Sequence, residues 1–151
     1  MALRVRLEYF IWATLLLWAL LTAIPATWWF DPDILYVKSY ERGKIPVDLL
    51  FSREVRHDFT GSYSVIVRDS NDTVVAEGNG GPFGYKSTST LPPDLTLAWW
   101  AGDIADTVRN LPAGLYNMET CWTVQTPFYV TPSKTVCVLS NVFEVTDAKT
   151  H

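Results

Sequence analysis

The chain has 151 residues and a formal net charge of −4, with 12 basic and 16 acidic residues. The basic residues are scattered along the sequence and form no cluster. Because nucleic acids and anionic membrane surfaces select proteins with clustered Lys and Arg, this pattern argues against both as ligands of the domain. Beyond an apolar N-terminal stretch, roughly 120 residues remain, enough for one domain with a modest core.

The first predicted element is a transmembrane helix over residues 9–30. This run contains 22 residues and no charged side chain. As an α-helix it would be about 33 Å long, close to the ~30 Å hydrocarbon core of a bilayer. Tyr9 and Trp12 near one end, with Trp28 and Trp29 at the other, are placed like interfacial aromatic anchors. The lipid bilayer is therefore an expected partner.

The charges that flank the apolar run predict its orientation. Two arginines lie within residues 1–8, whereas Asp31 and Asp33 follow the run. Because positively charged flanks stay in the cytoplasm, residues 1–8 are predicted to be cytoplasmic. The domain of residues 31–146 is then periplasmic or extracellular, and residues 147–151 form a flexible tail.

A cleaved signal peptide is the alternative to a membrane anchor. Its best cleavage position follows Ala26, because small residues are required there. Cleavage would leave residues 27–30 (Thr-Trp-Trp-Phe) as a strongly apolar start for a soluble domain, which favours the anchor. Pro25 lies near the end of the run and is expected to kink the helix or to end it early.

The remaining chain has the pattern of short strands separated by turns. Residues 59–69 alternate between two faces, and Asp69 begins a turn that leads into a hairpin. Asp103 could cap a single helical turn. Seven strands are expected, which predicts an all-β, two-sheet sandwich. Their ranges are 34–40, 47–55, 59–69, 73–77, 95–100, 115–125 and 134–146.

In the last predicted strand, the apolar residues expected to face the core do not all lie at alternate positions of one series. Val136 and Val138 lie on one parity, whereas Phe143 and Val145 lie on the other. Both pairs can be buried only if the strand contains a bulge, which is expected near residues 140–141.

A short segment resembles a known family. Residues 111–116 (Leu-Pro-Ala-Gly-Leu-Tyr) are similar to the turn before the penultimate strand of immunoglobulin-like and fibronectin type III-like domains. The resemblance implies an immunoglobulin-like antiparallel β-sandwich over about residues 34–146, in which the Tyr116 hydroxyl ties the corner. The inter-sheet cysteine pair with a tryptophan between is absent, which favours a plainer sandwich.

The two cysteines lie in the last two predicted strands. If these strands form a hairpin, Cys121 and Cys137 can lie opposite one another within reach of a disulfide. An oxidising extracytoplasmic location favours that bond. A register slip by one residue would instead leave two buried thiols. A metal or redox site is disfavoured because the sequence has no CxxC motif.

The sequence contains no set of residues typical of catalysis. It has no GxSxG motif, and His57 beside Asp58 is interpreted as a solvated turn. The Asp69–Asn71–Asp72 cluster is interpreted as an ordinary turn and not as a calcium loop. We therefore predict no catalytic, metal or cofactor-binding residues and no enzyme activity.

Aromatic residues in predicted loops are the best candidates for binding a partner. Residues 78–85 are too rich in glycine for a regular strand and are predicted to form a flexible loop that carries Phe83 and Tyr85. Phe128 and Tyr129 lie at the tip of the last hairpin, and rigid aromatic side chains are preferred interface anchors. Trp100 and its neighbour point to opposite faces of a strand. The alternative is that these rings fold back over the ends of the sandwich.

These features together predict a non-catalytic interaction module. A membrane-tethered sandwich would present its aromatic loops to a membrane or envelope protein partner. The alternatives are an accessory subunit of a membrane enzyme complex and a carrier of a small ligand or a metal.

Overall fold

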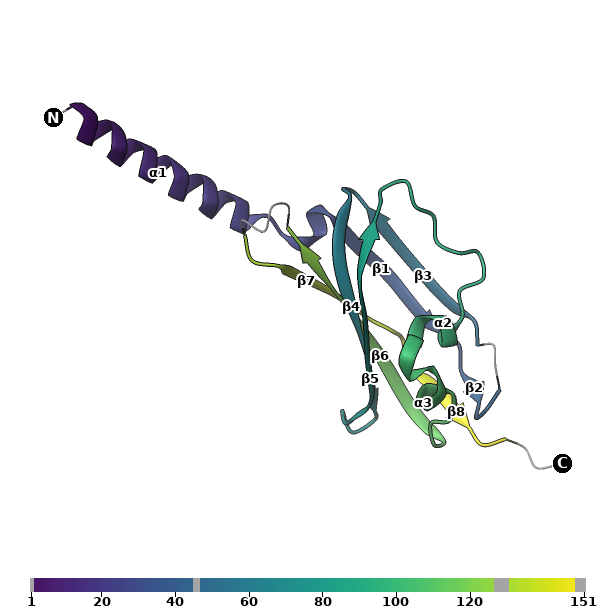
Figure 1. The fold of residues 1–151 in the computed structure, drawn as a ribbon. Helices are drawn as coiled ribbons and strands as arrows, with labels where there is room; N and C mark the ends of the chain where they lie inside the picture. Colours follow the sequence, from purple (N-terminus) through teal and green to yellow (C-terminus); the bar gives the residue numbers. More distant parts are fainter. Residues whose placement is uncertain (1, 45–46, 127–130, 149–151) are drawn as a thin grey trace.

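A computed structural model describes residues 2–44, 47–126 and 131–148. Helix α1 (Ala2–Ala23) projects from one end of a β domain, and the C-terminus lies at the opposite end (Figure 1). Within α1, residues Arg6–Ala23 are long and apolar enough to cross a membrane, and the domain buries none of this segment. The coarse organisation, an apolar helix before a β-rich domain, agrees with the sequence.

The predicted helix limits of 9–30 are wrong at the C-terminal end. Helix α1 ends at Ala23, two residues before Pro25, and the 3₁₀ turn η1 (Ala26–Trp28) follows. Proline lacks an N–H and disfavours helical geometry in the residue before it, so the helix stops there. Trp29 and Phe30 are buried in the domain core. Trp29 is therefore part of the β domain and not an interfacial anchor.

The domain contains two sheets. The small sheet pairs β1 (Phe30–Val37) with β3 (Leu49–Val55) in antiparallel register. The large sheet has the order β2-β8-β6-β4-β5, and β7 also pairs with β6. Its strands are β2 (Tyr40–Glu41), β4 (Phe59–Asp69), β5 (Val74–Tyr85), β6 (Gly114–Gln125), β7 (Lys134–Leu139) and β8 (Phe143–Thr146). The predicted limits of the strand at 59–69 are confirmed, and the observed β6 begins one residue before the predicted one.

The predicted single strand over 134–146 is wrong, although the irregularity lies where a bulge was expected. Residues 134–146 form two strands, β7 and β8, with residues 140–142 between them. The Asn141 side chain accepts a hydrogen bond from the Val37 backbone N–H at 2.7 Å and donates to the Val37 carbonyl at 3.0 Å. The amide thus makes the two hydrogen bonds with Val37 that the backbone of a neighbouring strand would otherwise make, and it joins the large sheet to β1 of the small sheet.

The prediction of a flexible loop at residues 78–85 is wrong. Strand β5 continues to Tyr85, and Gly78, Asn79 and Gly80 pair in sequence with β4. The Tyr63 ring of β4 lies against Gly80, where a Cβ atom would come within 2.7 Å of the ring. Glycine here permits a close approach between a backbone and a side chain instead of giving the chain flexibility.

The predicted strand at 95–100 is also wrong. The segment forms the short helix α2 (Leu97–Ala101), followed by η2 (Gly102–Ile104) and α3 (Ala105–Arg109). The hydroxyl of Thr96 accepts a hydrogen bond from the Trp99 N–H at 3.2 Å and so caps α2. The helical turn expected near Asp103 is present, although Asp103 lies within η2 and does not cap α3.

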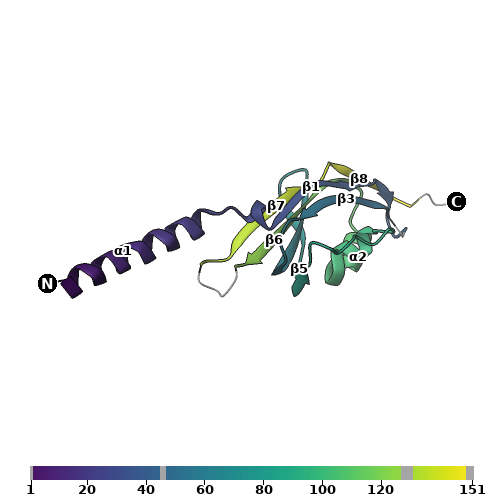
Figure 2. The ribbon, with the colours of Figure 1, turned by 90° about the horizontal axis from the view of Figure 1, so that it is seen from above.

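An aromatic cluster fills the space between the two sheets. The rings of Phe51 and Trp122 stack at 5.4 Å, Phe30 lies 4.8 Å from Trp122, and Trp100 packs edge-on against Phe51. Strand β1 lies near β7, and the small sheet covers the large one (Figure 2). After β5, the chain runs past β3 to α2 (Figure 1). The two sheets thus meet along the β1 side, and on the other side the segment before α2 bonds to the start of β3, with Leu49 N–H donating to the Leu95 carbonyl at 3.1 Å.

Candidate functional site

A pocket of about 560 Å³ lies on the side of the sandwich formed by β3, β5 and α2. We call it the aromatic pocket. Strands β3, β4, β5 and β6, the segment after β5, and helix α2 all contribute to its walls. Its volume lies within the range of small-molecule and side-chain binding sites. The lining residues are Arg53, Tyr63, Phe83, Gly84, Tyr85, Ser89, Leu91, Pro92, Trp99, Trp100, Thr120 and Trp122.

Aromatic stacking holds the pocket walls in place. Tyr85 stacks on Phe59 with ring centroids 4.6 Å apart, and Phe83 stacks on Tyr63 at 6.0 Å. Such pairs restrict ring orientation and add to the stabilisation that burial provides. Burial also raises the pKa of the Tyr85 hydroxyl, which remains neutral at physiological pH.

Two adjacent tryptophans of α2 have different roles. Trp99 is 61% exposed, whereas Trp100 is buried, and its indole Nε1–H donates to the Thr120 hydroxyl at 3.0 Å. This hydrogen bond fixes the ring of Trp100 against the core. Trp99 is thus the more accessible ring of the pair at the pocket.

Arg53 supplies the positive charge of the pocket. It lies on the inward face of β3, half-buried, with Cζ 5.9 Å from the Phe30 ring and 5.6 Å from the Tyr85 ring. These cation–π contacts partly replace water around the guanidinium. Burial lowers the pKa of the Arg53 guanidinium from its ordinary value. Among the residues that the structure describes, no carboxylate forms an ion pair with Arg53.

The structure brings three of the five predicted binding residues together. Phe83, Tyr85 and Trp100 all line the aromatic pocket. Trp100 is only 7% exposed and forms part of the pocket wall, whereas its neighbour Trp99 is the exposed ring of the pair. Phe128 and Tyr129 lie outside the described residues.

The sequence reasoning missed the central residue of the site. Arg53 shares the inward parity of Val47, Leu49 and Phe51, which are all buried. A charged residue at a core position of an alternating strand is an available signal for a site, because a buried charge requires compensation. Trp99 and Trp122 were not singled out as pocket residues either.

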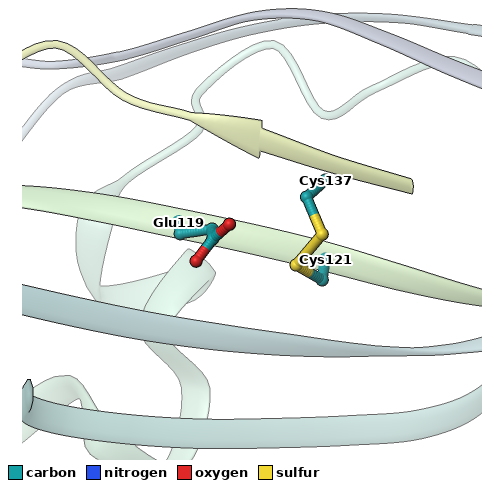
Figure 3. Close-up of side chains that lie close together, drawn as sticks. All are labelled: Glu119, Cys121 and Cys137. Carbon is teal, nitrogen blue, oxygen red and sulfur yellow. A yellow bond between two sulfur atoms is a disulfide. The ribbon is translucent and has the colours of Figure 1, made fainter. Parts of the chain in front are cut away.

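The two cysteines form the predicted disulfide. Cys121 and Cys137 are directly paired across β6 and β7, with their sulfur atoms 2.07 Å apart. Glu119 lies beside them, so three groups with ligand atoms are close together (Figure 3). Sulfur atoms joined in a disulfide are not thiolates, which are the metal-binding form of cysteine. Glu119 also lies 4.0 Å from the Arg68 guanidinium, and the cluster is therefore interpreted as structural.

The other groups considered from the sequence have structural contacts. Asp58 accepts hydrogen bonds at 2.8 and 2.9 Å from the backbone N–H and hydroxyl of Ser87, which lower the pKa of the Asp58 carboxyl. His57 stacks on Trp28 at 5.2 Å. Asp69 accepts from the N–H groups of Asn71 and Thr73, as in an Asx turn.

The corner before β6 has the hydrogen bond that the family resemblance implied. The Tyr116 hydroxyl donates to the Pro112 carbonyl at 2.9 Å.

The chain matches no protein-family model, and comparisons with curated proteins and with solved structures find no match. The fold and the pocket therefore define the protein as a β-rich domain of two sheets that follows an apolar N-terminal helix.

Proposed function

We propose that the protein is a single-pass, membrane-anchored binding module without catalytic activity, whose aromatic pocket receives a group of a membrane or envelope protein. The observation that carries this proposal is the pocket itself, an aromatic concavity on the side of β3, β5 and α2. Concave aromatic sites bury the side chains of a partner efficiently, and Trp, Tyr and Arg are the residues most often found at such contacts.

The composition of the pocket favours binding over catalysis. Its polar side chains, among the described residues, are one arginine, two hydroxyls and two tyrosines. No His, Cys, Asp or Glu is among these lining residues, so a general base or an activated nucleophile is not formed from them.

An immunoglobulin-like sandwich is the fold we propose, supported by the Tyr116–Pro112 hydrogen bond and the sheet order. The small sheet has fewer strands than those domains use, and α2 and α3 lie in the connection between β5 and β6.

Three observations support attachment to the membrane with the domain outside the cytoplasm. Helix α1 is apolar over Arg6–Ala23, and its two arginines, Arg4 and Arg6, lie at its N-terminal end. The disulfide is typical of an oxidising compartment. Lys134 of β7 donates from its ammonium to the Thr22 carbonyl at 2.6 Å, which ties the end of α1 to the domain.

The apolar residues 27–30 are compatible with either a cleaved signal peptide or a retained helix. Trp29 and Phe30 pack into the core, so the apolar character of residues 27–30 is not evidence against cleavage after Ala26. The contact between Lys134 and Thr22, and the burial of Ala26, favour retention of α1 instead. Alkaline extraction of membranes and N-terminal analysis of the mature protein test this point. Mature protein that begins after Ala26 and is released by alkali would contradict the anchor.

Site-specific photocrosslinking tests the binding function. A photoreactive phenylalanine analogue in place of Phe83 is expected to capture one discrete protein in the membranes of the source cells. The matched control places the analogue at Val74, which is similarly exposed at the far end of β5. Trp99→Ala should remove the adduct formed from position 83. Equal adducts from both positions, or an adduct that survives Trp99→Ala, would contradict a role for the pocket.

The pocket volume also supports a second candidate function, which is to carry a small ligand. Native mass spectrometry of the detergent-extracted chain distinguishes the two. A co-purified small molecule that blocks crosslinking at position 83 would favour the carrier.

A further inference from the structure

We propose that the aromatic pocket recognises an aromatic carboxylate, either a free acid or the C-terminal aromatic residue of a peptide, with Arg53 pairing the carboxylate. The inference rests on the proposed binding function and adds the chemical class of the ligand. It begins from the position of Arg53 on the inward face of β3, among core residues.

The guanidinium of Arg53 is arranged for an anion that the described chain does not supply. It contacts the rings of Phe30 and Tyr85, and no carboxylate of the described residues pairs with it. Removing a guanidinium from water costs free energy, as the lowered pKa of Arg53 reflects. A carboxylate that approaches within the pocket offsets this cost through charge-assisted, bidentate hydrogen bonds.

The charge balance favours a carboxylate over a phosphate. Arg53 is the cationic residue among those that line the pocket in the described part of the chain. A carboxylate brings one negative charge, whereas a phosphate monoester brings about 1.5 to 2 charges at neutral pH. A phosphate would therefore leave excess charge in a partly desolvated site, and a carboxylate would not.

The walls favour a flat apolar body beside the carboxylate. Phe83, Tyr85 and Trp99 offer ring surface to the pocket, and aromatic groups stack well on such faces.

Titration of the full-length chain in detergent tests the inference, with tryptophan fluorescence and calorimetry as readouts. The probes are 3-phenylpropionate, 3-phenylpropionamide, and a peptide that ends in phenylalanine with either a free carboxylate or an amide. Hydrogen bonds to charged groups contribute about 1.5–3 kcal/mol. We therefore expect each acid to bind at least ~10-fold more tightly than its amide. The free acid and the peptide acid distinguish the two sources of the ligand.

Variants assign the preference to Arg53. Arg53→Gln should remove the difference between acid and amide, whereas Arg53→Lys should retain part of it because the charge remains. Arg68→Gln is the matched control, because Arg68 does not line the pocket. It should bind the probes like the original chain. If Arg53→Gln fails to fold, the comparison of acid with amide in the unaltered chain remains decisive.

The outcomes separate this inference from the proposed function. Equal binding of acid and amide overturns the carboxylate assignment and leaves the binding function intact. Failure of all probes to bind, with specific crosslinking at position 83, also overturns only the ligand class. Failure of both the probes and the crosslinking overturns the two proposals together.

Discussion

The Tyr116 hydroxyl donates a hydrogen bond to the carbonyl oxygen of Pro112, four residues earlier, and so closes the corner that begins β6. Tyr116→Phe keeps the ring and removes this bond. We expect the free energy of unfolding to fall by about 1 kcal/mol, the usual net contribution of such a bond. Denaturant unfolding measures the change. Tyr36→Phe, at an exposed position of β1, is the control, and an equal loss there would contradict a special role for the corner.

Removal of the disulfide should destabilise the domain. The bond closes a loop with a sequence separation of 16 residues between Cys121 and Cys137. A loop of this size corresponds to about 3 kcal/mol in the chain-entropy model. The double variant Cys121→Ser/Cys137→Ser should unfold at correspondingly lower denaturant. A reductant should shift the original chain toward the variant and leave the variant unchanged.

A methyl group at Gly61 should disturb the large sheet. A Cβ atom there would lie 2.7 Å from the backbone oxygen of Thr123 and 3.0 Å from the Phe59 ring. Gly61→Ala should therefore cost about 1–3 kcal/mol in unfolding free energy, as overpacking usually does. Gly84→Ala is the matched control on β5, because no heavy atom of the described residues, apart from Gly84 and its chain neighbours, lies within 4 Å of the added carbon. Similar stabilities for the two variants would contradict the predicted clash.

The hydrogen bond between Trp100 and Thr120 should contribute to stability because both groups are buried. Thr120→Val keeps the side-chain shape and leaves the Trp100 indole N–H without an acceptor. The expected loss is about 1–3 kcal/mol, the cost of a buried unsatisfied donor. Thr135→Val, at an exposed position of β7, should change the midpoint little.

Alkaline pH should weaken the fold through Tyr40. Burial raises the pKa of its hydroxyl to about 12, from 10.0 in the unfolded chain, and the hydroxyl donates to the Val108 carbonyl. Between these two values the unfolded state has lost the proton while the folded state keeps it. The free energy of unfolding therefore falls as pH rises from about 10 to about 12, by up to about 2 kcal/mol. Tyr40→Phe should show a shallower decline over this range, and a decline as steep as that of the original chain would contradict the assignment.

The alternating strands were predictable because their pattern depends on local sequence. In β4, the buried residues Phe59, Val65 and Val67 share one parity, and the parity change between Val138 and Phe143 located the break. Local composition was misleading for residues 78–85, whose glycines lie in strand β5, and for residues 95–100. Residues 95–100 contain aromatic residues typical of strands, yet the Thr96 cap begins a helix.

The pocket could be predicted only in part. Phe83 and Tyr85 were recognisable as aromatic candidates, although their segment is a strand and not a loop. The pocket forms where β3, β5, β6 and α2 come together. These elements are far apart in the sequence, so no local sequence pattern predicts that they lie side by side. Arg53 shows the difference clearly. Its inward parity was visible in the sequence, but the absence of a carboxylate partner among the described residues became evident only from the fold.

The amide of Asn141 has a mechanical consequence for the sandwich. It fastens the boundary between β7 and β8 to Val37 of β1, on the side away from the aromatic pocket. Both hydrogen bonds come from one side-chain amide, so substitution of Asn141 by an apolar residue would remove the two together and weaken the attachment of the small sheet to the large one at this boundary.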